Sequence, residues 1–317
     1  MSGPVFPVRR AVIDVGTNSV KLLVADVGAD FVTPVLEESE QTRLGRGFYE
    51  TNQLQPEAIA DTARAVANYA ALAREKHSSP PRVIATSAAR DARNQSELLD
   101  AITHASGLAV EIITGEQEAE WVYAGVRSDP KLAGQRLLIL DVGGGSTEFI
   151  LGDNAHPQFS RSFRLGSVRL LKEQRPSDPP TPEELARCRA SLKNFFAEHI
   201  TPVVAPALAA GSPGVRLIGT GGAATILARM EYALDRYSRH AIEGARLPRE
   251  SVARWMAQLW AMPLAERRTI VGLPKKRADV ILAGLAIYEA VLQEFNFTEL
   301  HASTRGLRFA AVLQPVP

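Results

Sequence analysis

Residues 137–152 read LLILDVGGGSTEFILG, two apolar runs separated by a turn of three consecutive glycines. The run of four aliphatic residues is typical of a fully buried strand, and it leads to the carboxylate of Asp141. The glycines let backbone N–H groups approach an anion closely, and Ser146 and Thr147 add hydroxyl donors. The stretch therefore predicts a strand, a turn of phosphate size and a second strand, although a purely structural turn would have the same pattern.

Two carboxylates flank this turn, Asp141 on one side and Glu148 on the other. Carboxylate oxygens are hard ligands, and Mg²⁺ in proteins is commonly held by one or two of them beside a phosphate group. The turn therefore predicts a Mg²⁺ site next to the phosphate site.

Residues 11–27, AVIDVGTNSVKLLVADV, repeat this arrangement near the N-terminus. An apolar run reaches Asp14 and Gly16, a small polar turn follows, and a second apolar run comes after it. Self-similarity of this kind indicates a duplicated architecture. We expect two similar domains that face each other across a cleft, with one phosphate-binding turn on each side, so that a single polyanion is bound by both.

The length of 317 residues favours two domains, each large enough for its own core. The segment DPKLAGQR, residues 129–136, reads as the linker between them. We therefore expect an N-terminal domain over residues 1–128 and a C-terminal domain over residues 129–317, which a closing helix from Arg305 completes.

Charge is almost balanced, with 36 Lys and Arg against 35 Asp and Glu, so no bulk affinity for nucleic acid or an acidic membrane is indicated. The N-terminal residues lack the apolar core of a signal peptide, and no apolar run is long enough to cross a bilayer. We expect a soluble, cytoplasmic protein with a local anion site. The single cysteine, Cys188, excludes an internal disulfide and has no metal-binding spacing around it.

A short strand over residues 82–85 is followed by TSAARDARN, which places Ser87 and Arg90 where a strand ends and a helix begins. Ligands of α/β sheets commonly bind at such positions. Arg90 offers a forked set of donors that suits phosphate oxygens. The alternative is a surface arginine, with Ser87 serving only to cap the helix.

The next strand runs into the acidic turn Gly115-Glu-Gln-Glu-Ala119, which opens a helix. Carboxylates in a first helical turn ordinarily complement the helix dipole. The same position, at a strand end and just before the second half of the chain, is also suited to a base that faces a bound phosphate. Glu118 is the candidate base and Glu116 the reserve.

A third glycine-rich turn follows a strand at residues 215–218 and comprises Gly219, Thr220, Gly221 and Gly222. One such turn is a weak signal, whereas three at strand ends in one chain indicate a function. The remainder reads as helices, including one over AERRTIVGL (265–273) and a long one that begins at Pro274. The pattern GxxxxGK[ST] is absent, which excludes a P-loop ATPase.

These segments occur in an order that resembles the Ppx/GppA phosphatase family: DVGTNSVKLLVADV, RLGRGF, TSAARDARN, TGEQEAEWVYAGV, LILDVGGGSTEFILG, RLGSVRL, GTGGAATILA and LPKKRADVILAG. The resemblance covers nearly the whole chain. It implies an α/β protein of two ribonuclease H-like domains, the duplicated fold shared with actin, sugar kinases and Hsp70. The family consists of exopolyphosphatases and guanosine pentaphosphate phosphohydrolases, and this chain resembles its short, two-domain members.

The resemblance also implies roles for individual residues. Glu118 matches the general base, Arg90 matches a phosphate-binding arginine, and Mg²⁺ is the implied cofactor. The implied Mg²⁺ ligands are Asp14, Asp141 and Glu148. The residues implied in phosphate binding are Gly16, Thr17, Asn18, Ser19, Gly143, Gly144, Gly145, Ser146 and Thr147, with Gly219, Thr220, Gly221 and Gly222 as a further loop of the cleft.

The implied reaction is hydrolysis of a terminal phosphoanhydride, with polyphosphate or guanosine pentaphosphate as substrate. Two alternatives remain open at this level: a phosphotransferase or ATPase of the actin and sugar-kinase type, and a non-catalytic sensor of polyphosphate or an alarmone. Neither the substrate preference nor the oligomeric state follows from the sequence, since the long apolar helices of the second half would suit either a hydrophobic core or the interface of a homodimer.

Overall fold

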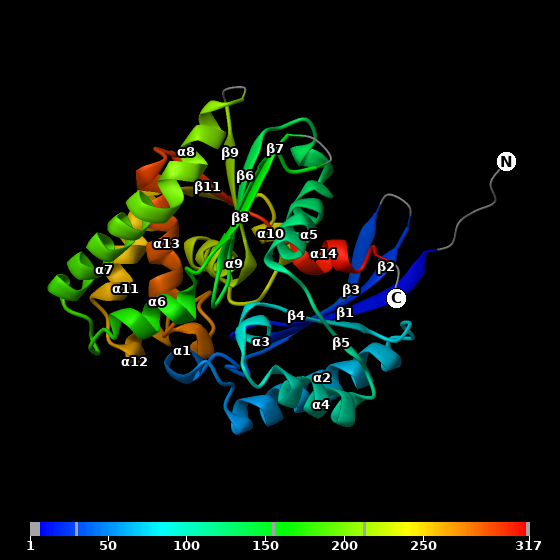
Figure 1. The fold of residues 1–317 in the computed structure, drawn as a ribbon. Helices are drawn as coiled ribbons and strands as arrows, with labels where there is room; N and C mark the ends of the chain where they lie inside the picture. Colours follow the sequence, from blue (N-terminus) through cyan, green and yellow to red (C-terminus); the bar gives the residue numbers. More distant parts are fainter. Residues whose placement is uncertain (1–6, 29–30, 154–155, 212–213, 315–317) are drawn as a thin grey trace. The chain divides into compact units, whose positions relative to one another are not determined.

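The computed structural model describes residues 7–28, 31–153, 156–211 and 214–314. The chain alternates strands and helices through two separate units (Figure 1). The first unit contains the chain up to Ser128 and the residues from Leu307 onward, and the second contains Asp129–Gly306. Each unit has its own sheet and hydrophobic core, so each is described separately.

The sheet of the first unit has the order β3-β2-β1-β4-β5. Strands β1, β2 and β3 form an antiparallel meander, while β4 and β5 run parallel to β1. The central strand β1 is almost fully buried toward its carboxyl end, as its apolar sequence predicts. The bounds are β1 Val8–Val15, β2 Val20–Val27, β3 Val32–Glu40, β4 Arg82–Ala85 and β5 Val110–Ile112.

Helices α2 and α4 pack against each other, and α2 lies on β1 and β2. Helix α5 packs against α14, and α14 also contacts β1. The bounds of the helices in this unit are α1 Phe48–Thr51, α2 Pro56–Glu75, α3 Ser87–Asp91, α4 Gln95–Ser106, α5 Gly115–Arg127 and α14 Leu307–Ala311.

Helix α14 differs from the sequence-based expectation, which placed the closing helix in the second domain. Its Phe309 is buried, and the Arg308 guanidinium donates a hydrogen bond of 2.6 Å to the carbonyl of Leu22 on β2. Arg10 on β1 donates in turn to the Leu313 carbonyl at 3.0 Å. The chain therefore returns to the first unit because its last helix completes the packing around β1.

The sheet of the second unit has the order β10-β11-β9-β6-β7-β8. Its strands β8, β7, β6, β9 and β11 repeat the order and directions of β3, β2, β1, β4 and β5, with β10 added at one edge. This repeat confirms the predicted α/β class and the duplication. The bounds are β6 Leu137–Val142, β7 Thr147–Gly152, β8 Phe159–Phe163, β9 Arg216–Thr220, β10 Arg246–Pro248 and β11 Glu299–Ala302.

Helix α13 is the centre of the second core and contacts α6, α7, α9 and α11 (Figure 1). The other elements of this unit are η1 Pro130–Leu132, α6 Ser167–Gln174, α7 Pro182–Phe195, η2 Phe196–Ile200, α8 Thr201–Ala209, α9 Gly221–Glu231, α10 Arg239–Ile242, α11 Arg249–Trp260, α12 Leu264–Arg267, η3 Lys275–Arg277 and α13 Ile281–Glu294.

Two helix predictions in this region were wrong. The helix expected over residues 265–273 is only the short α12, which ends at Arg267. Gly272, near the end of the expected helix, adopts φ +88°, and its backbone lies against that of Arg229, so a helix could not have continued through it. The long helix expected from Pro274 begins only at Ile281, after the separate 3₁₀ turn η3. A close backbone approach of this kind leaves no periodic signal in the sequence.

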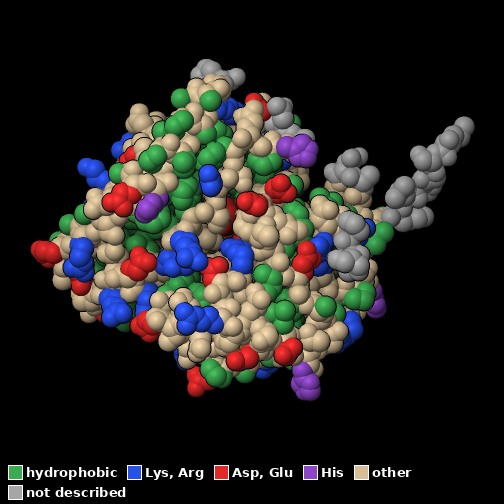
Figure 2. Space-filling view, in the orientation of Figure 1, with side chains coloured by type: hydrophobic (Ala, Val, Ile, Leu, Met, Phe, Trp, Pro, Cys, Tyr) green, Lys and Arg blue, Asp and Glu red, His purple; other side chains and the backbone are tan. Residues whose placement is uncertain are grey.

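Basic and acidic side chains are interspersed on the face shown in Figure 2, as the balanced composition predicts. Among the residues that the structure describes, no helix combines the length and the apolar character needed to span a membrane.

Candidate active-site residues in each unit

The turn between β1 and β2 carries the first predicted phosphate loop. Gly16 donates its N–H to the Ser19 carbonyl at 3.1 Å, which closes the turn. Asp14 and Lys21 are directly opposite each other on the two strands, and the Lys21 ammonium lies 3.8 Å from Oδ2 of Asp14. Lys21 was not among the predicted site residues, although aligning the two repeats places it at the position of Glu148.

Asn18 has a buried amide that suits an anion. Its side chain is 6% exposed, and its Oδ1 accepts a hydrogen bond of 3.1 Å from Gln41. Its Nδ2 is buried and has no hydrogen-bond partner among the residues that the structure describes. A buried donor left unsatisfied costs about 1–3 kcal/mol, so an oxygen atom of a bound phosphate would complete the site.

The RLGRGF segment supports this turn from behind. Arg43 donates its N–H to the Asn18 carbonyl at 3.1 Å, and Gly45 donates to the Thr17 carbonyl at 2.7 Å. A Cβ at Gly45 would lie 2.4 Å from Cγ2 of Thr17, so any larger residue would force the Thr17 side chain to shift. Arg46 forms an exposed ion pair of 3.0 Å with Glu57. The glycine of this segment thus shapes the loop.

Arg90 and Glu118, the two predicted catalytic residues, are brought together within the first unit. Nη1 of Arg90 donates to Oε2 of Glu118 at 3.1 Å and to the Ile113 carbonyl at 3.0 Å. Arg90 comes from α3 and Glu118 from the first turn of α5, so both lie just beyond the carboxyl ends of β4 and β5. Parallel neighbouring strands place such residues at the same edge of the sheet.

The two candidate bases differ in their surroundings. Glu118 is 7% exposed and ion-paired, whereas Glu116 is exposed. Thr114 caps α5 by accepting a hydrogen bond of 3.1 Å from the N–H of Gln117, which fixes the direction in which the helix leaves the strand. The burial and the arginine partner favour Glu118 over Glu116 as the functional carboxylate.

In the second unit, the turn between β6 and β7 has the same construction. Gly143 donates its N–H to the Ser146 carbonyl at 3.0 Å. Asp141 and Glu148 are directly opposite each other, as Asp14 and Lys21 are in the first hairpin. Glu148 is only 1% exposed and accepts a hydrogen bond of 2.8 Å from the hydroxyl of Ser162 on β8. Two carboxylates therefore occupy one row on one face of the sheet.

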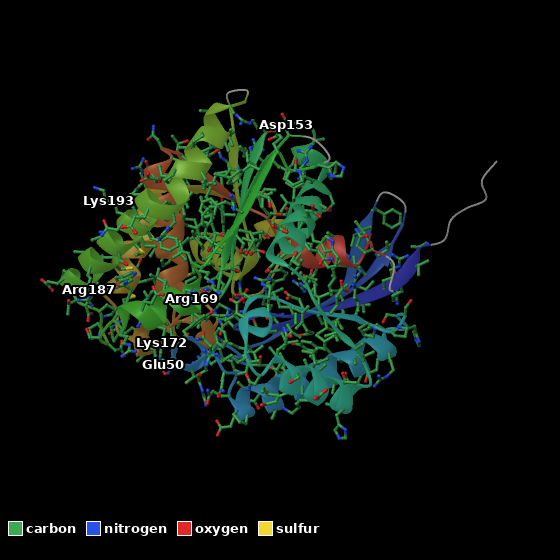
Figure 3. All side chains as sticks on the ribbon, viewed as in Figure 1. Glu50, Asp153, Arg169, Lys172, Arg187 and Lys193 are labelled. Carbon is green, nitrogen blue, oxygen red and sulfur yellow. The ribbon has the colours of Figure 1, made fainter. Side chains whose placement is uncertain are left out.

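Helix α6 fixes the carbonyl groups of all three glycines in this turn. Ser167 donates its N–H to the Gly143 carbonyl at 2.9 Å, and the N–H of Val168 donates to the Gly144 carbonyl at 2.9 Å. The carbonyl of Gly145 accepts from Nε of Arg169, a residue of α6 that is labelled in Figure 3, at 3.0 Å. The backbone of the turn is thereby held in one conformation.

The hydroxyl of Thr147, a predicted phosphate-binding residue, has a partner within the protein. Its side chain is fully buried, and its hydroxyl donates to the Leu165 carbonyl. That hydroxyl ties β7 to the segment before α6 and so supports the turn, whereas a phosphate donor would have to face the ligand. Residue type alone could not distinguish the two uses of a threonine.

The third glycine-rich turn joins β9 to α9 and lies next to Asp141. Asp141 and Thr220 are paired in register on the parallel strands β6 and β9. Gly221 has φ +81°, and a Cβ there would lie 2.4 Å from Oδ1 of Asp141. The carboxylate therefore packs against the backbone of this turn, which requires glycine.

The donor sets of the two hairpins suit different ligands. Mg²⁺ in proteins takes one or two carboxylates and completes its shell with phosphate oxygens and water. Asp141 and Glu148 fit that description, whereas Asp14 faces the ammonium of Lys21, which repels a cation. Within the described part of the chain, no group of three or more His, Cys, Asp or Glu residues could enclose a metal. A metal held by Asp141 and Glu148 would therefore complete its shell with water and phosphate oxygens.

Cys188 is buried on α7, and burial raises the pKa of its thiol to about 12. A thiol that stays protonated is a poor nucleophile, which agrees with the absence of a cysteine role in the sequence analysis.

Comparison with known proteins supplies independent information. A model of the Ppx/GppA phosphatase family matches residues 23–315. Exopolyphosphatase 2 of Mycobacterium tuberculosis is 34% identical over 299 residues, which cover 91% of each chain. The crystal structure of the Aquifex aeolicus Ppx/GppA family member is 31% identical, covers 96% of each chain and superposes with a TM-score of 0.78. An exopolyphosphatase from Cytophaga hutchinsonii is 27% identical, with a TM-score of 0.85 over 95% of this chain and 96% of that one.

Proposed function

The chain belongs to the Ppx/GppA phosphatase family, and we propose that it is an exopolyphosphatase that hydrolytically releases the terminal orthophosphate of inorganic polyphosphate. The observation that carries this proposal is the pairing of buried Glu118 with Arg90 at the strand ends of the first unit. Relatives that match over nine-tenths of the chain and are named exopolyphosphatases support it.

Glu118 acts as the general base in this proposal. Its carboxylate accepts a hydrogen bond from the attacking water, orients it toward the terminal phosphorus and takes its proton. Arg90 holds that carboxylate by one nitrogen, Nη1, at 3.1 Å. Its other guanidinium nitrogens can donate to the oxygens of the terminal phosphoryl group as charge develops there.

The glycine-containing turns bind phosphate groups of the polyphosphate substrate. Asn18 supplies the buried Nδ2 donor of the first turn, and Gly16 and Ser19 keep that turn closed. The second turn, over residues 143–146, presents backbone N–H groups and the Ser146 hydroxyl, while α6 holds its carbonyl groups from the other side. Donors fixed in advance need no reorganisation when the phosphoanhydride breaks.

Asp141 and Glu148 would hold Mg²⁺ through their carboxylates. A bound Mg²⁺ would neutralise charge on the phosphate oxygens and on the leaving phosphate. Ser162 keeps the Glu148 carboxylate oriented by its hydrogen bond of 2.8 Å. The backbone of Gly221 limits where the Asp141 carboxylate can lie.

The same residues would serve the terminal 5′-phosphate of guanosine pentaphosphate, and we extend the proposal to this second substrate because the family unites both activities. The bond broken is a terminal phosphoanhydride in either case, so the chemistry described for Glu118 and Arg90 is unchanged. Only residues that contact the rest of the substrate would determine whether polyphosphate or guanosine pentaphosphate is preferred.

The test is phosphate release by the purified protein with Mg²⁺, comparing short and long polyphosphate, guanosine pentaphosphate and ATP. Release from polyphosphate without nucleotide is expected, and Glu118→Ala should lower it about 10²–10⁴-fold. Glu116→Ala, the matched change at an exposed carboxylate of the same helical turn, should leave it unchanged. Activity on ATP alone would favour the actin and sugar-kinase alternative, and binding without release would favour a sensor.

A further inference from the structure

Tyr288 on α13 holds the end of β9 from within the core of the second unit. Its side chain is fully buried, and its hydroxyl donates to the Thr220 carbonyl at 3.1 Å. Thr220 is the last residue of β9 and directly precedes Gly221 of the third glycine-rich turn. This hydrogen bond therefore fixes the point at which the strand enters the turn.

This hydrogen bond lies at the last paired row of β6 and β9. Strands β6 and β9 run parallel from Leu137 to Asp141, and Asp141 pairs with Thr220. Beyond that row β6 enters the second phosphate turn and β9 enters the third glycine-rich turn, so ladder hydrogen bonds end there. The Tyr288 hydroxyl therefore holds β9 where its backbone pairing with β6 stops.

The third turn has anchors on its other side as well. The hydroxyl of Thr220 donates to the Arg305 carbonyl at 2.8 Å, and the N–H of Ser303 donates to the Gly219 carbonyl at 2.8 Å. Glu243 in turn accepts hydrogen bonds from Ser303 and from the Thr304 N–H, each of 2.9 Å. The turn is thus held by hydrogen bonds to Ser303 and Arg305 and by the hydrogen bond from Tyr288.

The Asp141 carboxylate is confined between these anchored parts. Its Oδ1 lies where a Cβ on Gly221 would approach to 2.4 Å, so a small shift of the third turn must move the carboxylate. Burial, together with the Asp141 charge, raises the pKa of Tyr288 well above its ordinary value, which keeps the hydroxyl protonated and able to donate.

We propose that Tyr288 is a positioning residue: its hydroxyl holds the Thr220 carbonyl and thereby sets the place of the third turn and of the Asp141 carboxylate that packs against it. It touches neither substrate nor metal. This inference rests on the proposed function, in which Asp141 is a ligand of the divalent cation. Residues behind a metal ligand commonly change metal affinity or activity about 10–100-fold when they are altered.

The test is Tyr288→Phe, which removes one oxygen atom and keeps the ring that fills the core. The dissociation constant for Mn²⁺, measured by electron paramagnetic resonance without substrate, is expected to rise about 10-fold. The kcat for polyphosphate should fall by a similar factor while KM changes little. The matched control is Tyr69→Phe, a buried tyrosine of α2 in the first unit, which should leave both quantities at wild-type values.

A second variant separates positioning from loss of fold. Replacement of Tyr288 by 4-aminophenylalanine keeps a group that can donate and accept at the same place, so it should restore Mn²⁺ affinity and kcat. Wild-type Mn²⁺ binding in folded Tyr288→Phe, or no rescue in a folded 4-aminophenylalanine variant, would overturn the inference. Because Mn²⁺ binding is measured without substrate, failure of the wild type to hydrolyse polyphosphate would count against the proposed function alone.

Discussion

The hairpins β1–β2 and β6–β7 have nearly the same backbone and opposite charge at one position. In both, a glycine N–H closes the turn onto a serine carbonyl at 3.0–3.1 Å, and the next-to-last residue of the first strand is an aspartate. The residue opposite that aspartate is Lys21 in the first hairpin and Glu148 in the second. One architecture therefore presents a neutralised carboxylate in one unit and a pair of carboxylates in the other.

This difference predicts that the two duplicated loops bind different ligands. A carboxylate beside an ammonium has little attraction for a cation, whereas two carboxylates on one row attract a divalent cation strongly. The first turn instead contains a buried, unsatisfied amide donor, which suits a phosphate oxygen. We therefore revise the expectation for Asp14 and propose that the metal ligands are Asp141 and Glu148.

The largest effect should come from removing the aspartate of each hairpin. Asp141→Asn takes a ligand from the carboxylate pair, and phosphate release is expected to fall about 10²–10³-fold, with weaker Mn²⁺ binding. Asp14→Asn breaks only the contact with Lys21, so Mn²⁺ binding should stay at the wild-type value. Titration of both variants with Mn²⁺ checks this, and equal losses of affinity would remove the proposed difference.

The glycines that support the two turns should differ in tolerance. A Cβ at Gly166 would lie 2.4 Å from the Gly144 carbonyl oxygen, which is backbone, whereas a Cβ at Gly45 meets a methyl group of Thr17 at the same distance. Gly166→Ala is expected to lower the free energy of unfolding by about 2–3 kcal/mol, and Gly45→Ala by about 1 kcal/mol. Urea denaturation measures both. The reverse order would mean that the second turn is the more adaptable one.

Asn18→Asp tests whether the first turn binds phosphate. The change keeps the oxygen that accepts from Gln41 and replaces the buried NH₂ group with an oxygen that repels an anion. We expect KM for polyphosphate to rise about 10-fold, equivalent to about 1.4 kcal/mol of binding. Melting temperature is the control for folding. An unchanged KM in a folded protein would show that this amide does not face the substrate.

Lys21→Glu makes the first hairpin resemble the second. Two carboxylates would then lie directly opposite each other, which is expected to cost up to about 1 kcal/mol of stability. Mg²⁺ should recover part of that loss in Lys21→Glu and none in Lys21→Gln, which lacks the second charge. Thermal unfolding with and without Mg²⁺ provides the measurement. If Mg²⁺ does not distinguish the two variants, charge alone does not create a metal site here.

The apolar runs and glycine turns predicted most of the fold, because both hairpins have signals within a few neighbouring residues. The family and the duplicated α/β architecture were confirmed on that basis. The wrong predictions lie where contacts between distant segments determine the structure: the backbone of Gly272 packs against Arg229 within the segment expected to be helical, and α14 packs in the first unit. The hydroxyl of Thr147 also donates its hydrogen bond to a distant segment, at the carbonyl of Leu165.

By itself, the sequence determined the strands, the turns and the residue types that could bind phosphate and Mg²⁺, because backbone preference and hydrophobic pattern are local properties. Only the tertiary structure decided which of these side chains meet. It paired Arg90 with Glu118 across 28 residues and bonded Tyr288 to Thr220 across 68. Such contacts depend on how strands and helices pack, and packing depends on the shape of the whole core rather than on any one segment.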